Sequence, residues 1–87
     1  MAKVEIYSSP FCGYCGRAKR LLSTKGVEYI DYDIMLDDSK RVEMTERTGG
    51  RTSIPQIFIN GALIGGADEL SALDKQGKLE ALLKGGA

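Results

Sequence analysis

The chain has 87 residues, enough for one domain over residues 1–87 with a modest core and too few for two. Twelve acidic and twelve basic residues cancel, so the net charge gives no reason to expect a nucleic acid or an anionic membrane as partner. Because the chain has no histidine, it cannot form a cysteine–histidine catalytic dyad, a Cys-x-x-Cys-His haem attachment site or a zinc site with imidazole ligands.

The sequence also gives an expectation for the cellular compartment of the protein. No apolar run approaches the roughly 20 residues that a membrane span needs, and the N-terminus shows no signal-peptide pattern. We therefore expect a cytoplasmic protein. In a reducing compartment, a lone pair of cysteines is more typical of a redox or catalytic site than of a structural disulfide.

The first part of the chain alternates between strand and helix patterns. Residues 4–7 are rich in β-forming side chains and predict a first strand. A helical pattern starts at Cys12 and runs to residue 25, where Gly26 suits a helix end. Residues 27–34 predict a second strand, and a crossover this short implies that the two strands pair in parallel. The apolar face of the predicted helix comprises Tyr14, Ala18, Leu21 and Leu22.

The middle of the chain predicts a second helix. Asp37-Asp38-Ser39 offers N-caps for a helix that continues to Arg47, and Thr48-Gly49-Gly50 ends it. Acidic residues at its start and Arg47 near its end suit the helix dipole. Val42 and Met44 are expected to face the core.

The last part of the chain predicts a hairpin and a helical segment. Residues 56–59 and 62–64 predict two strands, joined by the strong hairpin signal Asn60-Gly61. The helical segment is divided at Gly77 and is followed by a tail at residues 85–87 that we expect to be frayed. Its apolar side comprises Leu70, Leu73, Leu79, Leu82 and Leu83. The order β-α-β-α-β-β-α predicts an α/β fold, a four-stranded mixed sheet flanked by helices.

The two cysteines stand two residues apart, where the first predicted helix begins. Only a thiolate is reactive, and a free cysteine with a pKa of about 8.5 is mostly protonated at neutral pH. Backbone N–H groups and the dipole at the helix N-terminus are expected to lower the pKa of Cys12. Cys15, one turn further along, is expected to be more shielded. We therefore predict Cys12 as the attacking nucleophile and Cys15 as the resolving thiol.

Two further motifs stand before the third strand and the last helix. If the Ile54–Pro55 bond is cis, the Ile54 backbone is free to pair with an extended peptide beside the cysteines. In Gly65-Gly66-Ala67-Asp68, the glycines allow close backbone approach, a helix N-terminus can bind a carboxylate, and Asp68 can accept from an ammonium group. An ordinary trans proline and a plain helix cap are the alternative interpretations.

Taken in order, these motifs resemble the glutaredoxins of the bacterial dithiol type. The matching segments cover almost the whole chain: Val4-Glu5-Ile6-Tyr7, Cys12-x-Tyr14-Cys15, Arg17-Ala18-Lys19, Leu21-Leu22, Lys25-Gly26-Val27, Ile54-Pro55-Gln56-Ile57-Phe58-Ile59 and Ile64-Gly65-Gly66-Ala67-Asp68-Glu69-Leu70. The resemblance implies a thioredoxin-like fold. It also implies that the protein uses glutathione to reduce protein disulfides and protein–glutathione mixed disulfides, without a metal ion or a nucleotide.

The resemblance further implies how glutathione is bound. The backbone before a cis proline pairs with the cysteinyl part, the start of the last helix holds the γ-glutamyl end, and Arg41 contacts the glycyl carboxylate. The protein is expected to act as a monomer. The residues expected to form the glutathione site are Tyr14, Arg41, Ser53, Ile54, Pro55, Ala67 and Asp68.

The sequence departs from the pattern of the family in three ways. Gly13 replaces the usual proline between the cysteines, and Ser9 replaces the usual lysine three residues before the nucleophile. Ser53-Ile54 replaces the usual Thr-Val and keeps its backbone role. The loss of the lysine removes one expected carboxylate partner, for which Arg51 is a candidate substitute.

Gly13 also keeps a second function open. Glycine loosens the turn and restores a backbone N–H that proline lacks, and relatives resembling this Cys-Gly-Tyr-Cys version include cluster binders. In this alternative, the Cys12 thiolates of two chains and two glutathione thiols ligate a [2Fe–2S] cluster in a dimeric carrier or sensor. A true thioredoxin is disfavoured because the chain has no tryptophan.

Overall fold

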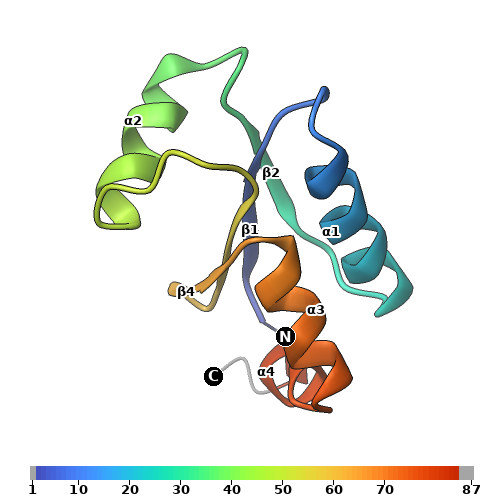
Figure 1. Ribbon diagram of the computed structural model, residues 1–87. Coiled ribbons are helices and arrows are strands. Elements are labelled where there is room, and N and C mark those ends of the chain that lie inside the picture. Colours follow the sequence, from blue (N-terminus) through green and yellow to red (C-terminus); the bar gives the residue numbers. More distant parts are fainter. Residues whose placement is uncertain (1, 85–87) are drawn as a thin grey trace.

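The computed structural model describes residues 2–84, which form one sheet with helices on both faces (Figure 1). The order of elements confirms the predicted fold class, with the last helical segment divided at Gly77, whose φ is 72°. The predicted fraying of residues 85–87 lies outside the described residues. The elements are β1 (Val4–Ser8), α1 (Gly13–Thr24), β2 (Ile30–Asp33), α2 (Asp38–Arg47), β3 (Gln56–Ile59), β4 (Ala62–Gly65), α3 (Ala67–Lys75) and α4 (Leu79–Lys84).

The sheet is mixed, with the strand order β2-β1-β3-β4. Strands β1 and β2 pair in parallel, with α1 as the crossover, while β1 with β3 and β3 with β4 pair antiparallel. The turn between β3 and β4 has positive φ angles at both central residues, 52° at Asn60 and 81° at Gly61. Such a turn matches the twist of the strands it joins, so the predicted hairpin forms where expected.

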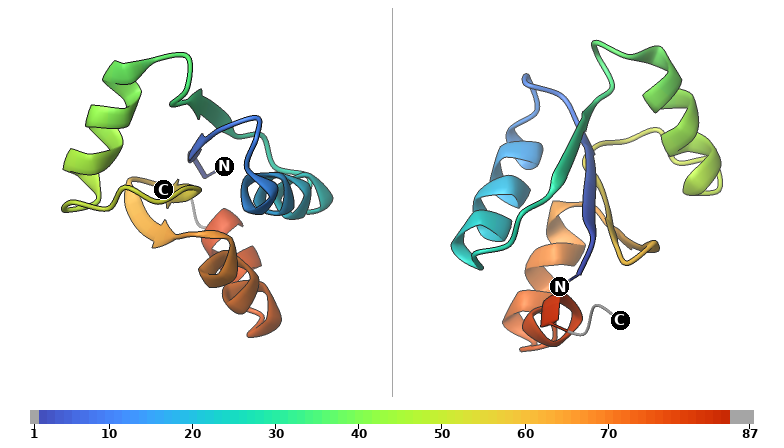
Figure 2. Two further views of the ribbon diagram at one scale, coloured as in Figure 1. Left: turned by 45° about the horizontal axis from the view of Figure 1, so that its top comes forward. Right: turned by 180° about the vertical axis from the view of Figure 1, so that it is seen from behind.

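The two faces of the sheet are covered unequally (Figure 2). Helices α1, α3 and α4 lie on one face, and α2 lies alone on the other. Since successive residues of a strand point to opposite faces, Ile6 and Tyr7 contribute to different clusters of the core. The larger cluster lies between the sheet and the three helices and contains Val4, Ile6, Ala18, Leu22, Ile57, Ile59, Ala67, Leu70, Leu79 and Leu83. The smaller cluster consists of Tyr7, Ile34, Met44 and Phe58.

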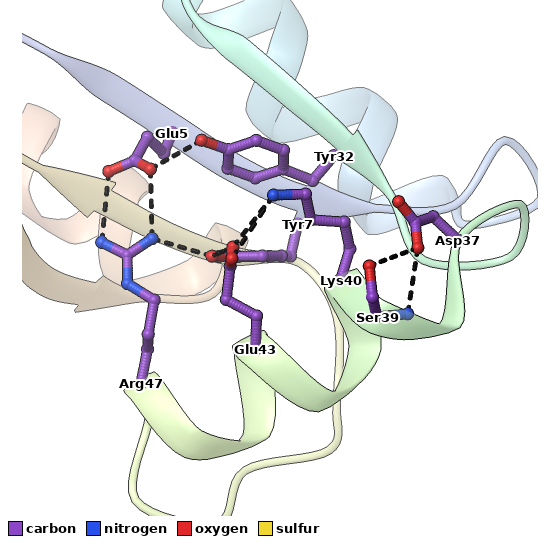
Figure 3. A network of polar contacts seen from close by, with 8 residues as sticks. All are labelled: Glu5, Tyr7, Tyr32, Asp37, Ser39, Lys40, Glu43 and Arg47. Atoms are coloured by element: carbon purple, nitrogen blue, oxygen red, sulfur yellow. Dashed lines mark hydrogen bonds and ion pairs between the residues drawn. The ribbon is translucent and has the colours of Figure 1, made fainter.

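A polar network joins α2 to the sheet beneath it (Figure 3). Arg47 donates two hydrogen bonds to the Glu5 carboxylate, at 3.1 and 3.2 Å, and one to the Tyr7 hydroxyl at 2.8 Å. The Tyr7 hydroxyl donates to Glu43, and the Tyr32 hydroxyl donates to Glu5 at 2.8 Å. Burial alone would raise the pKa of Glu5, but the hydrogen bonds from Arg47 and Tyr32 outweigh it and hold that pKa below its usual value.

Several predicted core contacts are wrong. Val42 is 56 % exposed, because it stands two residues, or about 200°, around the helix from the buried Met44. Tyr14 is 58 % exposed, since the first turn of α1 faces the groove described below. Leu82 is also exposed.

The second strand begins at Ile30 rather than at the predicted residue 27. Among residues 2–84, no helix is both long and apolar enough to cross a lipid bilayer.

Candidate active site

Cys12 is the N-cap residue of α1. Its sulfur accepts a hydrogen bond from the backbone N–H of Cys15 at 3.2 Å, the bond that a serine or threonine hydroxyl oxygen makes in an ordinary cap. The preceding loop is held by hydrogen bonds from the Cys12 and Phe11 backbone N–H groups to Ser9. The predicted position of Cys12 at a helix start is therefore confirmed, and the positive end of the helix faces its sulfur.

The two thiols have different environments. Cys12 is partly exposed, whereas Cys15 is only 1 % exposed, and both are free. Burial raises the pKa of the Cys15 thiol to about 12, and a hydrogen bond between the two cysteine side chains adds to the effect. The prediction that Cys15 is the more shielded thiol is confirmed. One accessible sulfur and one protected sulfur is the arrangement that sequential attack and resolution require.

The Ile54–Pro55 peptide bond is cis. The Ile54 carbonyl oxygen lies 3.8 Å from the Cys12 sulfur, so the backbone before the proline borders the reactive thiol, as the sequence predicted. The loop is fixed by Gln56, whose Nε2 donates to the Ser53 carbonyl at 2.9 Å and to the Ser53 hydroxyl at 3.2 Å. Gln56 was not among the predicted site residues, because a glutamine next to a proline carries no signal of its own.

A groove of about 190 Å³ lies beside Cys12. It brings together six of the seven residues expected to bind glutathione, and it adds Arg51, the candidate substitute cation. Arg41 is not among the lining residues, and its guanidinium lies 3.9 Å from the sulfur of Met35. The residues that line the groove are Tyr14, Arg51, Ser53, Ile54, Pro55, Gln56, Gly66, Ala67, Asp68 and Glu69.

The paired glycines bring the start of α3 close to Pro55. Gly65 has a φ of 118°, and a Cβ there would stand 2.7 Å from Glu69 Oε1. A Cβ on Gly66 would stand 3.4 Å from the Pro55 carbonyl oxygen. The Gly66 N–H donates to Glu69 Oε1 at 2.9 Å, which caps the helix. Gly65 therefore requires glycine because of its φ and its close contact with Glu69, whereas a Cβ on Gly66 would make an ordinary van der Waals contact.

The charges along this groove are mixed. Arg51 and the N-terminus of α3 offer positive potential to an anion, while the Asp68 carboxylate can accept from an ammonium group. Within residues 2–84, no group of three or more potential ligands among His, Cys, Asp and Glu could hold a metal ion. The arrangement suits a zwitterionic peptide beside a reactive thiol.

Comparisons with known proteins agree with this geometry. The family model described as Glutaredoxin matches residues 4–64. Glutaredoxin 3 of Escherichia coli (strain K12) is 54% identical over 84 residues, which are 97% of this chain and 100% of that protein. The solution structure of glutaredoxin from Brucella melitensis has a TM-score of 0.82 and 49% identity, and the match covers 97% of this chain and 90% of that one.

A structure of a ligand complex is similar as well. The crystal structure of the buckwheat glutaredoxin–glutathione complex has a TM-score of 0.86 and 29% identity, and the match covers 95% of this chain and 77% of that one. These neighbours have the thioredoxin-like fold, so that prediction is confirmed. The family model and the identity over nearly the full length show that this chain belongs to the glutaredoxin family of thiol–disulfide oxidoreductases.

Proposed function

We propose that this protein is a glutathione-dependent oxidoreductase that reduces protein disulfides and protein–glutathione mixed disulfides. The observation that carries the proposal is the position of the Cys12 sulfur. It caps α1, is partly exposed and lies 3.8 Å from the Ile54 carbonyl oxygen beside the groove. A peptide bound in that groove would present its own sulfur to Cys12.

In removal of glutathione from a protein, Cys12 acts alone. Its thiolate attacks the glutathione sulfur of the mixed disulfide, and the protein sulfur leaves as a thiolate that takes a proton from water. A second glutathione thiolate then attacks the sulfur of glutathione bound to Cys12. This step releases oxidised glutathione, one half of which comes from the substrate, and restores the Cys12 thiolate, so one free glutathione is consumed for each mixed disulfide.

In reduction of a protein disulfide, both cysteines act. Cys12 attacks one sulfur of the substrate, and the other sulfur leaves and takes up a proton. Cys15 then loses its proton, attacks Cys12 and forms the Cys12–Cys15 disulfide, while the second substrate sulfur leaves as a thiol. Two glutathione molecules reduce that disulfide in turn.

The groove supports glutathione as the reductant. The Ser53-Ile54 backbone can pair with the cysteinyl part of the tripeptide, and the Ala67 N–H together with Asp68 can hold the γ-glutamyl end. We propose Arg51 as the partner of the glycyl carboxylate, because it lines the groove. Arg41, the residue expected from the resemblance, would have to leave Met35 to do so. The buckwheat relative solved as a glutathione complex supports the same ligand.

Two single substitutions test the proposal. The Cys12→Ser variant should lose all reduction of a glutathionylated peptide by glutathione, because it removes the attacking sulfur. The Cys15→Ser variant should retain that activity but lose reduction of a protein disulfide. Coupling to NADPH and glutathione reductase gives the rate. A variant pair in which Cys15→Ser is inactive and Cys12→Ser active on the glutathionylated peptide would contradict the proposed roles.

The second candidate is the glutathione-ligated [2Fe–2S] dimer. It is supported by the partial exposure of the Cys12 thiol and by the open space at Gly13, where a Cβ would meet no atom within 4 Å. Each chain of the dimer would supply one thiolate, that of Cys12, to the cluster. Anaerobic purification with glutathione, followed by absorption spectroscopy and gel filtration, tests it. A colourless monomer would contradict this candidate, and it would agree with a monomeric reductase.

A further inference from the structure

A second groove, of about 300 Å³, runs between α1 and α3. The two helices lie side by side on the same face of the sheet (Figure 1). The lining residues recur at helical spacing along both helices, and one of them, Leu21, packs partly buried against the core. They are Arg17, Ala18, Arg20, Leu21 and Thr24 from α1, and Ala67, Ser71, Asp74 and Lys75 from α3.

This groove carries positive charge that the protein does not neutralise. Arg17, Arg20 and Lys75 line it, and within residues 2–84 none of the three forms an ion pair. The one carboxylate of the groove, Asp74, is already bound by Lys25 at 2.6 Å. The excess is local, because acidic and basic residues balance over the whole chain.

The basic groove continues from the groove beside Cys12. Ala67 lines both. The Arg17 guanidinium lies over the Tyr14 ring, 5.6 Å from its centroid, and Tyr14 also lines the groove at the active site. Both grooves therefore meet at the first turn of α1, the helix that Cys12 caps. A substrate peptide whose cysteine belongs to the disulfide that Cys12 attacks can extend from there into the basic groove.

We propose that the α1–α3 groove is the docking site for an acidic segment of the protein substrate. The proposal deepens the proposed function and rests on it. From Arg17 to Thr24 the groove follows α1 for about 10 Å, which an extended peptide covers with about three residues. Preferred substrates should therefore carry two or three aspartate or glutamate residues within about six positions of the reactive cysteine.

The test compares two double variants with equal changes of charge. Arg20→Glu/Lys75→Glu reverses the groove, and Lys78→Glu/Lys84→Glu reverses two exposed lysines outside it. Each is assayed with glutathionylated peptides that differ only in an acidic, neutral or basic triplet, placed on either side of the cysteine. A small glutathione mixed disulfide that cannot reach the α1–α3 groove reports the basal rate and the integrity of each variant.

The wild-type protein should prefer the acidic peptide, and added salt should reduce the preference. The groove variant should raise KM for the acidic peptide by about fivefold or more and lose the preference, while the control variant keeps it. Equal KM values for the three peptides in the wild-type protein would overturn the proposal. So would an equal loss in both variants, since that would show steering by net charge.

A binding measurement separates this proposal from the proposed function. The acidic peptide with serine in place of its cysteine cannot react, so its binding does not depend on any activity. Titration of this peptide should shift the backbone amide NMR signals of α1 and α3 in the wild-type protein and not in the groove variant. Shifts confined to other elements, or none, would overturn the docking site even if the protein reduces disulfides. Failure of the wild-type protein to reduce any peptide would contradict only the proposed function.

Discussion

The backbone N–H of Cys15 donates to the sulfur of Cys12 at 3.2 Å, so the buried cysteine helps to hold the accessible one at the start of α1. The same turn of helix gives the two thiols opposite environments. Cys12 borders a groove, and Cys15 is enclosed by the core. This asymmetry within one helical turn is the physical basis of the division of roles proposed above.

The first prediction concerns the reactivity of Cys15. Because burial raises its pKa to about 12, we expect iodoacetamide to modify Cys12 alone in the reduced, folded protein at neutral pH. The Cys12→Ser variant removes the contribution of Cys12 but keeps the burial, which is the larger cause, so Cys15 should still stay unmodified at neutral pH and react only in alkaline solution. Mass spectrometry of the intact protein measures both. The same variant unfolded in urea is the control and should react at the pH of an ordinary thiol. Modification of Cys15 in the folded variant at neutral pH would disprove the prediction.

The second prediction concerns the ion pair beneath α2. Arg47→Met should lower the free energy of unfolding by about 2 kcal/mol, because it leaves the buried carboxylate of Glu5 without its cation. The exposed Arg41 on the same helix gives a matched control, and Arg41→Met should change stability by less than about 0.5 kcal/mol. Urea unfolding at neutral pH measures both variants. Equal stability of the Arg47 and Arg41 variants would show that the network contributes nothing.

The third prediction gives the pH dependence of the same pair. The pKa of Glu5 is lowered from 4.5 in the folded protein, so the unfolded chain takes up its proton first as the pH falls. The contribution of the pair is therefore fully present above about pH 4.5 and is lost as the pH falls through the lower folded value. The stability difference between the wild-type protein and Arg47→Met should narrow over that range. A difference that stays constant into strong acid would be inconsistent with this assignment.

The fourth prediction contrasts two glycine substitutions. Gly65→Ala should destabilise the protein by about 1–3 kcal/mol, since φ is 118° there and the new Cβ would meet Glu69 Oε1. Gly16→Ala should instead stabilise it by about 0.5–1 kcal/mol, because Gly16 lies inside α1 with open space around it. Thermal unfolding of both variants gives the sign directly. An unchanged or raised melting temperature for Gly65→Ala would mean that the start of α3 tolerates a side chain there.

Local patterns predicted the fold because each element depends on neighbouring residues. The turn at Asn60-Gly61 and the division at Gly77 follow from the φ angles that these residues adopt easily. Helical spacing alone shows that Val42 and Met44, about 200° apart, cannot both face the sheet, but which of the two does so depends on contacts with the sheet, and it is Met44. The burial of Glu5 could not be predicted either, because its partner Arg47 is 42 positions away in the sequence.

Motifs predicted most residues of the candidate site, but they did not predict the residues that hold the site in place. The layout of strands and helices predicted that Pro55 lies beside Cys12, and the resemblance to the glutaredoxins added Asp68 to the same site. Arg41 shows the limit, since a position on α2 does not determine whether a long side chain reaches the groove. Gln56 shows another, because its contribution is to hold the Ser53 carbonyl, a contact that no sequence pattern encodes.

The last prediction tests that support. Gln56→Met keeps the size of a side chain that is 2 % exposed but removes the donor to Ser53, so the loop before Pro55 becomes less restrained. We expect KM for glutathione to rise by about two- to tenfold, the effect of one hydrogen bond, with little change in kcat. Stability should change by less than about 1 kcal/mol, because Gln56 Oε1 has no partner among residues 2–84 and its removal offsets the lost bonds.

Gln76 provides the control for this substitution, since it is an exposed glutamine at the end of α3, away from the groove. Gln76→Met should leave both kinetic constants unchanged. If Gln56→Met also left KM for glutathione unchanged, the Ser53 loop would be held well enough by Pro55 and β3 alone. A fall in kcat without a rise in KM would instead mean that Gln56 acts on the reacting sulfurs and not on the binding of the tripeptide.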